Sequence, residues 1–144
     1  MLAHADVFVQ NVIPGAMARL GLDEETLRCR HPRLITCSIS GYGADGPYRS
    51  KKAYDLLRAV RDRPAVGHRT PDSPAKAGIS VAAIAAGMYA YTGILTAPYE
   101  RERTGAGTGF EVAMLEAFGE WTSQPYLYGL FTDECGVSGR IRRR

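Results

Sequence analysis

Two short runs of apolar and β-branched residues lie in the first part of the chain. Val7-Phe8-Val9 is followed by Gln10-Asn11, and residues 34–39 (LITCSI) are followed by the glycine-rich stretch 41–48. Runs of this length that end in turn residues are typical of strands. Three glycines and a proline within residues 41–48 exclude regular structure there, so this stretch is predicted to be a loop.

The segment between these two strands carries start and stop signals for two helices. Pro14-Gly15 stands where a first helix begins, and Gly21 closes it as a C-cap. Asp23 is a suitable N-cap for a second helix, which ends before Pro32. A strand, two helices and a strand in this order predict an α/β fold with parallel strands.

The second half of the chain predicts a third strand between two further helices. The stretch 77–99 has no charged side chain, is rich in alanine and glycine, and predicts a buried, closely packed helix. Residues 101–109 are predicted to form a turn that leads into a strand at 110–114 (FEVAM). An amphipathic helix is predicted over 115–128, with a break or kink at Pro125.

The uncharged stretch 77–99 is also long enough to cross a bilayer. Its alanine and glycine content, together with Ser80, Thr92 and Pro98, gives it a weak transfer energy into lipid. We therefore expect a core helix and no membrane partner. The first residues also lack a basic segment followed by an apolar core, so no secretory signal is expected.

The composition of the chain limits the number of domains, the kinds of partner and the kinds of site that we expect. A chain of 144 residues, 45% hydrophobic and 23% charged, suits one globular domain. The net charge of +3 is small and dispersed, so no nucleic-acid partner is expected, and the basic run 140–144 is interpreted as a solvated tail. The cysteines and histidines have neither metal-ligand spacing nor a disulfide pattern, so we expect no metal site and a reducing, cytoplasmic location.

The first group of residues suited to ligand binding follows the first strand. In Asn11-Val12-Ile13-Pro14-Gly15 a strand end meets a helix start, where free backbone N–H groups favour an anion such as a phosphate. Arg19, on the helix that follows, is placed to add a bidentate contact. Taken alone, however, this pattern is explained better by an ordinary capped turn.

The second group follows the second strand. Ser38-Ile39-Ser40 leads into the loop 41–48, and Lys52-Ala53-Tyr54-Asp55 comes next. Ligands of open α/β sheets bind at the carboxyl ends of strands, and Lys52 offers a point charge for a phosphate. A surface turn with a solvated lysine fits these residues equally well.

These motifs resemble those of the family III CoA-transferases, the group that includes formyl-CoA and carnitine-CoA transferases. The segment 11–21 matches the family's N-F-x-P-G-x-x-x-R-L-G pattern except at Val12, which replaces an aromatic residue. SISGYG at 38–43 and KAYD at 52–55 match the family's S-I-S-G-F-G and K-A-Y-E/D patterns. The resemblance implies that the following residues bind CoA: Asn11, Val12, Ile13, Arg19, Lys52, Ala53, Tyr54 and Asp55.

Segment 76–87 (KAGISVAAIAAG) resembles the family's active-site helix, with Ala83 where members carry the nucleophilic aspartate. In the mechanism that the resemblance implies, this carboxylate attacks an acyl-CoA thioester and forms a mixed anhydride, which CoA thiolate converts into an enzyme thioester. An alanine methyl cannot act in this way. We therefore predict that the chain descends from CoA-transferases, which act on acyl-CoA and carboxylic acid substrates with no tightly bound cofactor. With alanine at position 83, we expect no turnover.

The resemblance spans about residues 5–128 and covers only part of a full-length member. It implies a Rossmann-type α/β large domain, incomplete here, in a homodimer of interlocked chains. Residues 1–131 are assigned to this partial large domain, with a divergent stretch at 58–70, and residues 132–144 to an unmatched basic tail.

Two other interpretations stay open. A chain without the nucleophile also suits a non-catalytic CoA-binding or oligomerisation module. The α-methylacyl-CoA racemases resemble the same group, but they carry a histidine acid/base in a G-H-D pattern where this chain has Ala53-Tyr54-Asp55. Without that imidazole, proton transfer at the α-carbon lacks one of its two bases, so a transferase is the better interpretation.

Overall fold

A computed structural model describes residues 2–51, 79–124, 127 and 131 of the chain. In this part of the chain three parallel strands form one sheet in the order β1-β2-β3. The strands are β1 (Val7–Gln10), β2 (Ile35–Ser40) and β3 (Gly109–Ala113). The predicted α/β fold with parallel strands is therefore confirmed.

The two faces of the sheet differ in character. Side chains alternate along β2, so Ile35, Cys37 and Ile39 share one face, and Thr36, Ser38 and Ser40 share the other. Helix α4 (Val81–Thr104) packs on the apolar face, where Ala85 and Ala86 contact Ile39 and Val112. On the opposite face, the hydroxyl-bearing side chains point away from α4.

Small side chains let α4 lie close to the strands. Its buried residues are all alanines: Ala82, Ala85, Ala86, Ala90 and Ala97. At Gly93 a Cβ would stand 2.5 Å from a ring carbon of Phe110 on β3, so a methyl group there would force this ring to shift. Helix α5 (Met114–Trp121) adds Ala117 to the same contact. The predicted close packing of this helix is thus confirmed on its alanine side.

The other side of α4 is exposed, so the prediction of a buried helix is correct for one side only. Five large apolar side chains lie there: Ile84, Met88, Tyr91, Leu95 and Tyr99, with exposed fractions of 46–70%. At Gly87 no atom lies within 4 Å of the place that a Cβ would occupy, so this glycine contributes nothing to the packing. By length and composition alone, α4 meets the requirements of a membrane-spanning helix.

The prediction that residues 101–109 form a turn is wrong in its first part, because α4 continues to Thr104. Arg101 is held at this end by an ion pair with Asp6, at 3.0 Å, and by donating to the Arg33 carbonyl, at 3.2 Å. Basic side chains in a last turn are favoured by the helix dipole. The helix ends at Gly105, whose φ of 77° is the left-handed conformation typical of a C-cap.

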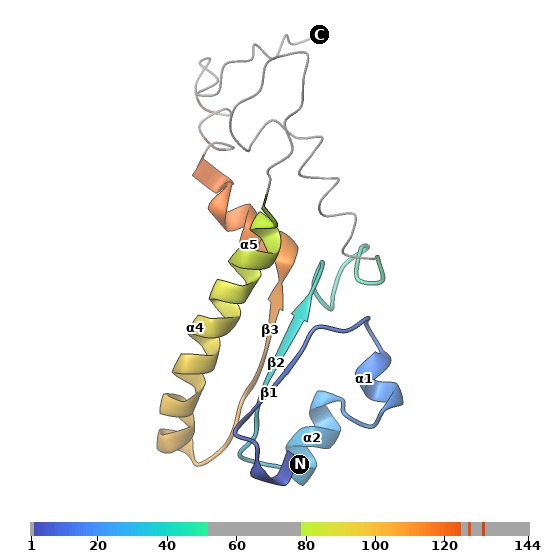
Figure 1. Ribbon diagram of the computed structural model, residues 1–144, viewed down its shortest axis with the longest axis vertical. Coiled ribbons are helices and arrows are strands. Elements are labelled where there is room, and N and C mark those ends of the chain that lie inside the picture. The colour runs from blue at the N-terminus through green and yellow to red at the C-terminus, as the bar shows by residue number, and fades with distance from the viewer. Residues whose placement is uncertain (1, 52–78, 125–126, 128–130, 132–144) are drawn as a thin grey trace.

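Two helices lie on the other side of the strands from α4, as Figure 1 shows. They are α1 (Ala16–Arg19) and α2 (Glu24–Arg30). The Asp23 side chain caps α2 as predicted: its carboxylate accepts the N–H and the hydroxyl of Thr26, both at 2.9 Å. These hydrogen bonds hold the pKa of Asp23 below its usual value.

Gly107 lies where the segment before β3 crosses the start of β2. Its N–H donates to the Pro32 carbonyl at 2.8 Å. A Cβ at this position would lie 2.6 Å from the carbonyl carbon of Leu34 and would overlap its oxygen. Because both partners are backbone, neither can move aside without disturbing the pairing of β2.

We predict that Gly107→Ala lowers the free energy of unfolding by about 1–3 kcal/mol, through overpacking against the backbone of β2. Urea denaturation measures the change. The matched control is Gly87→Ala, an exposed helical glycine with no neighbour at its Cβ position, which should gain up to about 1 kcal/mol from helix propensity. Equal effects of the two substitutions would contradict this account.

Candidate functional site

The predicted ligand-binding segments meet at one edge of the sheet. Since the strands are parallel, their carboxyl ends lie together, and loops 11–15 and 41–48 follow two of them. Helix α4 runs in the opposite direction: its first turns pack near Ile39 and Val112, and its last turn lies beside Arg33 before β2. The start of α4 therefore lies at this same edge, as Figure 1 shows.

Gly15 and Arg19 come together after β1. Gly15 has a φ of 78°, which an L side chain rarely adopts, and it is the N-cap residue of α1. The guanidinium of Arg19 folds back over this turn, with Nη1 3.9 Å from the position that a Gly15 Cβ would occupy. Arg19 is exposed and makes no hydrogen bond or ion pair with another described residue. The turn thus presents an uncompensated positive charge to solvent.

The helix behind this turn is shorter than predicted. α1 has four residues, and the Ala16 N–H already donates to the Ile13 carbonyl at 3.0 Å. It ends in a Schellman motif, in which Gly21 has a φ of 65° and the Leu22 N–H donates to the Met17 carbonyl at 2.9 Å. A single turn carries little macrodipole, so Arg19 is the main attraction that this segment offers an anion.

Val12 and Ile13 are exposed apolar residues in the loop after β1, and Asn11 beside them is exposed too. The conformation of the loop depends on Gln10, the last residue of β1, whose Oε1 accepts the Val12 N–H at 2.9 Å. The sequence analysis did not select Gln10. The one feature of the sequence that could have indicated its role is that it is a polar residue at the end of an apolar strand.

Three hydrogen bonds fix the loop after β2, one each to β2, α5 and β3. The Gly43 N–H donates to Ser40 Oγ at 2.9 Å, the Leu115 N–H donates to the Gly41 carbonyl at 3.0 Å, and the Ala44 N–H donates to Glu111 Oε2 at 3.2 Å. Glu111 lies on β3 and was also missed from the sequence. No local pattern pairs it with a loop 67 positions away.

Two tyrosines of this loop and a lysine that follows it lie close together. The rings of Tyr42 and Tyr48 are 5.7 Å apart with an interplanar angle of 50°. The Nζ of Lys51 lies 5.1 Å from the centre of the Tyr48 ring, within range of a cation–π contact. The predicted binding residues Lys52, Ala53, Tyr54 and Asp55 follow directly but lie outside the described residues.

Ala83 is the third residue of α4, in the first turn, and its side chain is exposed. The buried alanines before and after it, Ala82 and Ala85, point into the core, so Ala83 projects away from it. A carboxylate at this position of a long helix would be stabilised by the helix dipole. The position therefore suits an ionised acidic side chain.

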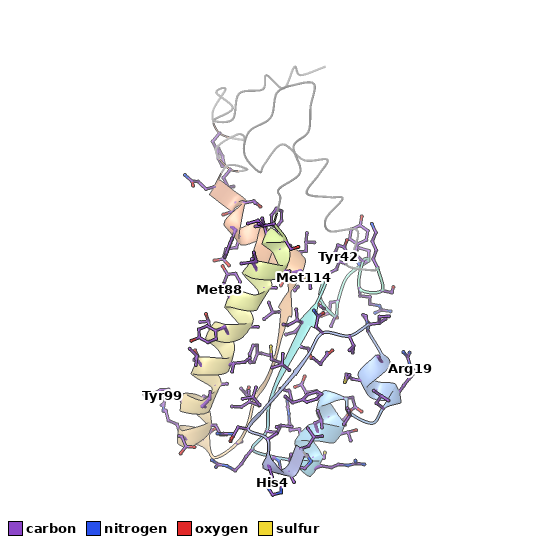
Figure 2. All side chains as sticks on the ribbon, viewed as in Figure 1. His4, Arg19, Tyr42, Met88, Tyr99 and Met114 are labelled. Atoms are coloured by element: carbon purple, nitrogen blue, oxygen red, sulfur yellow. The ribbon has the colours of Figure 1, made fainter. Side chains whose placement is uncertain are left out.

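The structure does not place Ala83 beside Arg19 directly. In Figure 1, α1 and α4 lie on opposite sides of the strands, and Figure 2 places Arg19 on one side and Met88 of α4 on the other. A ligand that contacts both must extend across the carboxyl edge of the sheet.

Thiol and metal chemistry have little support in the described residues. Burial raises the pKa of Cys37, which lies within β2, so its reactive thiolate is suppressed at neutral pH. Cys29 is exposed on α2, away from both loops. No three potential metal-ligating side chains come together in the parts of the chain that are described.

The sequence of the chain is similar to those of curated CoA-transferases. The chain is 37% identical over 118 residues to the acetyl-CoA:oxalate CoA-transferase of Acetobacter aceti, covering 81% of this chain and 30% of that enzyme. It is 35% identical over 117 residues to the succinate–glutarate CoA-transferase of Agrobacterium fabrum, covering 81% and 29%. The chain thus spans about 30% of the length of these relatives.

Solved structures share the fold. A CAIB/BAIF family protein from Brucella suis superposes with a TM-score of 0.82 at 30% identity, over 94% of this chain and 36% of that protein. A hypothetical protein from Mycobacterium tuberculosis gives a TM-score of 0.78 at 30% identity, over 90% and 37%. The sequence profile of CoA-transferase family III matches residues 1–142. The chain therefore belongs to CoA-transferase family III.

Proposed function

We propose that this protein binds CoA thioesters across the carboxyl edge of its sheet, as part of a protein that descends from enzymes moving CoA between an acyl-CoA and a carboxylic acid. The observation that carries the proposal is the guanidinium of Arg19 over the Gly15 turn, which has no hydrogen-bond or ion-pair partner among the described residues. It offers a charge to a phosphate at the same edge where ligands of parallel sheets bind. The family's CoA-transferases in Acetobacter and Agrobacterium support the choice of CoA as that ligand.

In this proposal the two ends of CoA lie on different elements. The phosphates lie near Arg19 and the exposed backbone of residues 11–15. A contribution from Lys52 to Asp55 stays a prediction from the sequence, because these residues lie outside the described part of the chain. The pantetheine arm crosses the ends of the strands, and the thioester reaches the first turn of α4. The exposed position of Ala83 supports this direction, because its side chain does not belong to the core.

The chemistry that the family carries out needs a nucleophile at position 83. An aspartate carboxylate would attack the thioester carbonyl carbon, the C–S bond would break, and CoA would leave as thiolate, giving an acyl anhydride. The thiolate would then attack the aspartyl carbonyl, release the acyl group as a carboxylate and leave an aspartyl–CoA thioester. Ala83 has no oxygen for the first step. We therefore propose that the chain binds CoA without turnover, which also suits a non-catalytic CoA-binding module.

We predict that the full 144-residue chain binds CoA in isothermal titration and that Arg19→Ala raises the Kd about 10- to 100-fold, by removing a charge-assisted contact to a phosphate. Arg30→Ala is the matched control: it removes an exposed arginine from α2 and should leave the Kd unchanged. Equal Kd values for Arg19→Ala and the unmodified chain would contradict the placement of the phosphates.

We predict that Ala83→Asp gains a covalent acyl or CoA adduct on incubation with an acyl-CoA, because it restores the attacking oxygen to the first turn of α4. Intact-mass spectrometry detects the adduct, and a CoA-exchange assay detects turnover. The control is Ala83→Asn, which has a similar shape but no nucleophilic carboxylate. Robust CoA transfer by the unmodified chain would refute the assignment of position 83.

We further propose that the chain forms a homodimer in the cytoplasm, through the exposed side of α4. Its five large apolar residues follow one another at spacings of three and four, the repeat with which two helices pack together. A second copy presents an identical stripe, so the same surface serves both partners of a two-fold dimer. Tyr99, at the far end of the stripe, points away from the strands in Figure 2.

We predict that light scattering after gel filtration gives twice the chain mass of 15.7 kDa. Leu95→Glu should raise the dimer Kd at least about 10-fold, because it places a charge in an apolar contact. Leu20→Glu changes a leucine off the stripe that is slightly more exposed than Leu95, and it serves as the control. A monomer for the unmodified chain would refute the dimer, and binding of α4 to lipid vesicles would replace it with a membrane contact.

A further inference from the structure

We propose that Glu111 is a positioning residue that holds the glycine loop 41–48 in the conformation used for binding CoA. This inference rests on the proposed function. It assigns a role to a side chain that lies on a different strand from the loop and far from it in the sequence.

The register of the sheet places Glu111 beside the loop. Glu111 pairs with Ser38 of β2, two residues before that strand ends. Its neighbours Phe110 and Val112 contact α4, so the Glu111 side chain points to the opposite face. From there its Oε2 reaches past the end of β2 and accepts the Ala44 N–H at 3.2 Å.

The loop has a conformation that needs such support. Gly43 and Gly46 have φ values of 86° and 91°, in the left-handed region. The other two hydrogen bonds that fix the loop involve residues nearer its start, Gly41 and Gly43, whereas Glu111 holds the chain at Ala44. Of the three contacts, it is also the one in which a side chain reaches the loop from β3, so the length of that side chain matters.

The contact with Ala44 fixes the base of the segment that carries Tyr48 and Lys51. If Glu111 is removed, that segment keeps its internal hydrogen bonds but loses its nearest connection to β3. A direct contact between Glu111 and CoA is disfavoured, because a carboxylate repels phosphate groups. The carboxylate therefore acts through the loop that it holds.

The test separates the reach of the side chain from its charge. Glu111→Gln keeps an acceptor oxygen at the same distance, Glu111→Asp keeps the charge but shortens the side chain, and Glu111→Ala removes both. Residue-resolved amide exchange of Ala44 and the Kd for CoA are measured for each. The control is Glu116→Ala on α5, whose exposed carboxylate makes no hydrogen bond or ion pair with a described residue.

We expect Glu111→Ala and Glu111→Asp to raise the exchange rate at Ala44 about 10-fold and to raise the Kd for CoA about 5- to 10-fold. Glu111→Gln should stay within about 2-fold of the unmodified chain in both measurements. If the alanine variant does not fold, the comparison of the aspartate and glutamine variants decides.

An unchanged exchange rate at Ala44 in Glu111→Asp would overturn the proposal, and so would a faster exchange with an unchanged Kd. If the unmodified chain does not bind CoA at all, the proposed function fails, and the positioning role fails with it. A chain that binds CoA regardless of the residue at position 111 overturns only the role of Glu111.

Discussion

The close contact between the alanine side of α4 and the strands is the constraint on which the rest of the structure depends. Ala85 and Ala86 bring the helix backbone near Ile39 and Val112, and at Gly93 a methyl group would already press on the Phe110 ring. This contact orients α4 antiparallel to the strands. Its first turn, with Ala83, therefore lies at the carboxyl edge of the sheet, and its last turn lies at the amino edge. A larger side chain at either alanine would move position 83 relative to both loops.

The sequence predicted the elements well, because the signals for them are local. The β-branched run of β2 and the Asp23 cap each act within a few residues, and both appear where expected. The exposure of α4 was predicted less well. Its uncharged composition indicated burial, but composition does not tell which side of a helix is covered. The extent of α4 was missed for a similar reason, since Arg101 belongs to the helix through contacts with Asp6 and Arg33 far away in the sequence.

In the candidate site, too, the sequence indicated the local features and missed those that depend on residues far apart in the chain. Gly15 and Arg19 are four positions apart, so a motif could indicate that they act together, and the structure places one over the other. Gln10 and Glu111 support the loops without belonging to either motif. Glu111 acts through strand register, which a single sequence does not reveal. The assignments of Ala83 and of residues 52–55 stay predictions, the latter because they lie outside the described residues.

One face of β2 is apolar and the other carries hydroxyl groups. This difference limits which kinds of surface can pack on the face that points away from α4. Thr36 is already covered, but Ser38 and Ser40 remain partly accessible. Stripping water from a hydroxyl that finds no new partner costs about 1–3 kcal/mol. An apolar surface that packs on this face is therefore disfavoured. A hydrated surface, or one with its own hydrogen-bond donors and acceptors, can pack there without that loss.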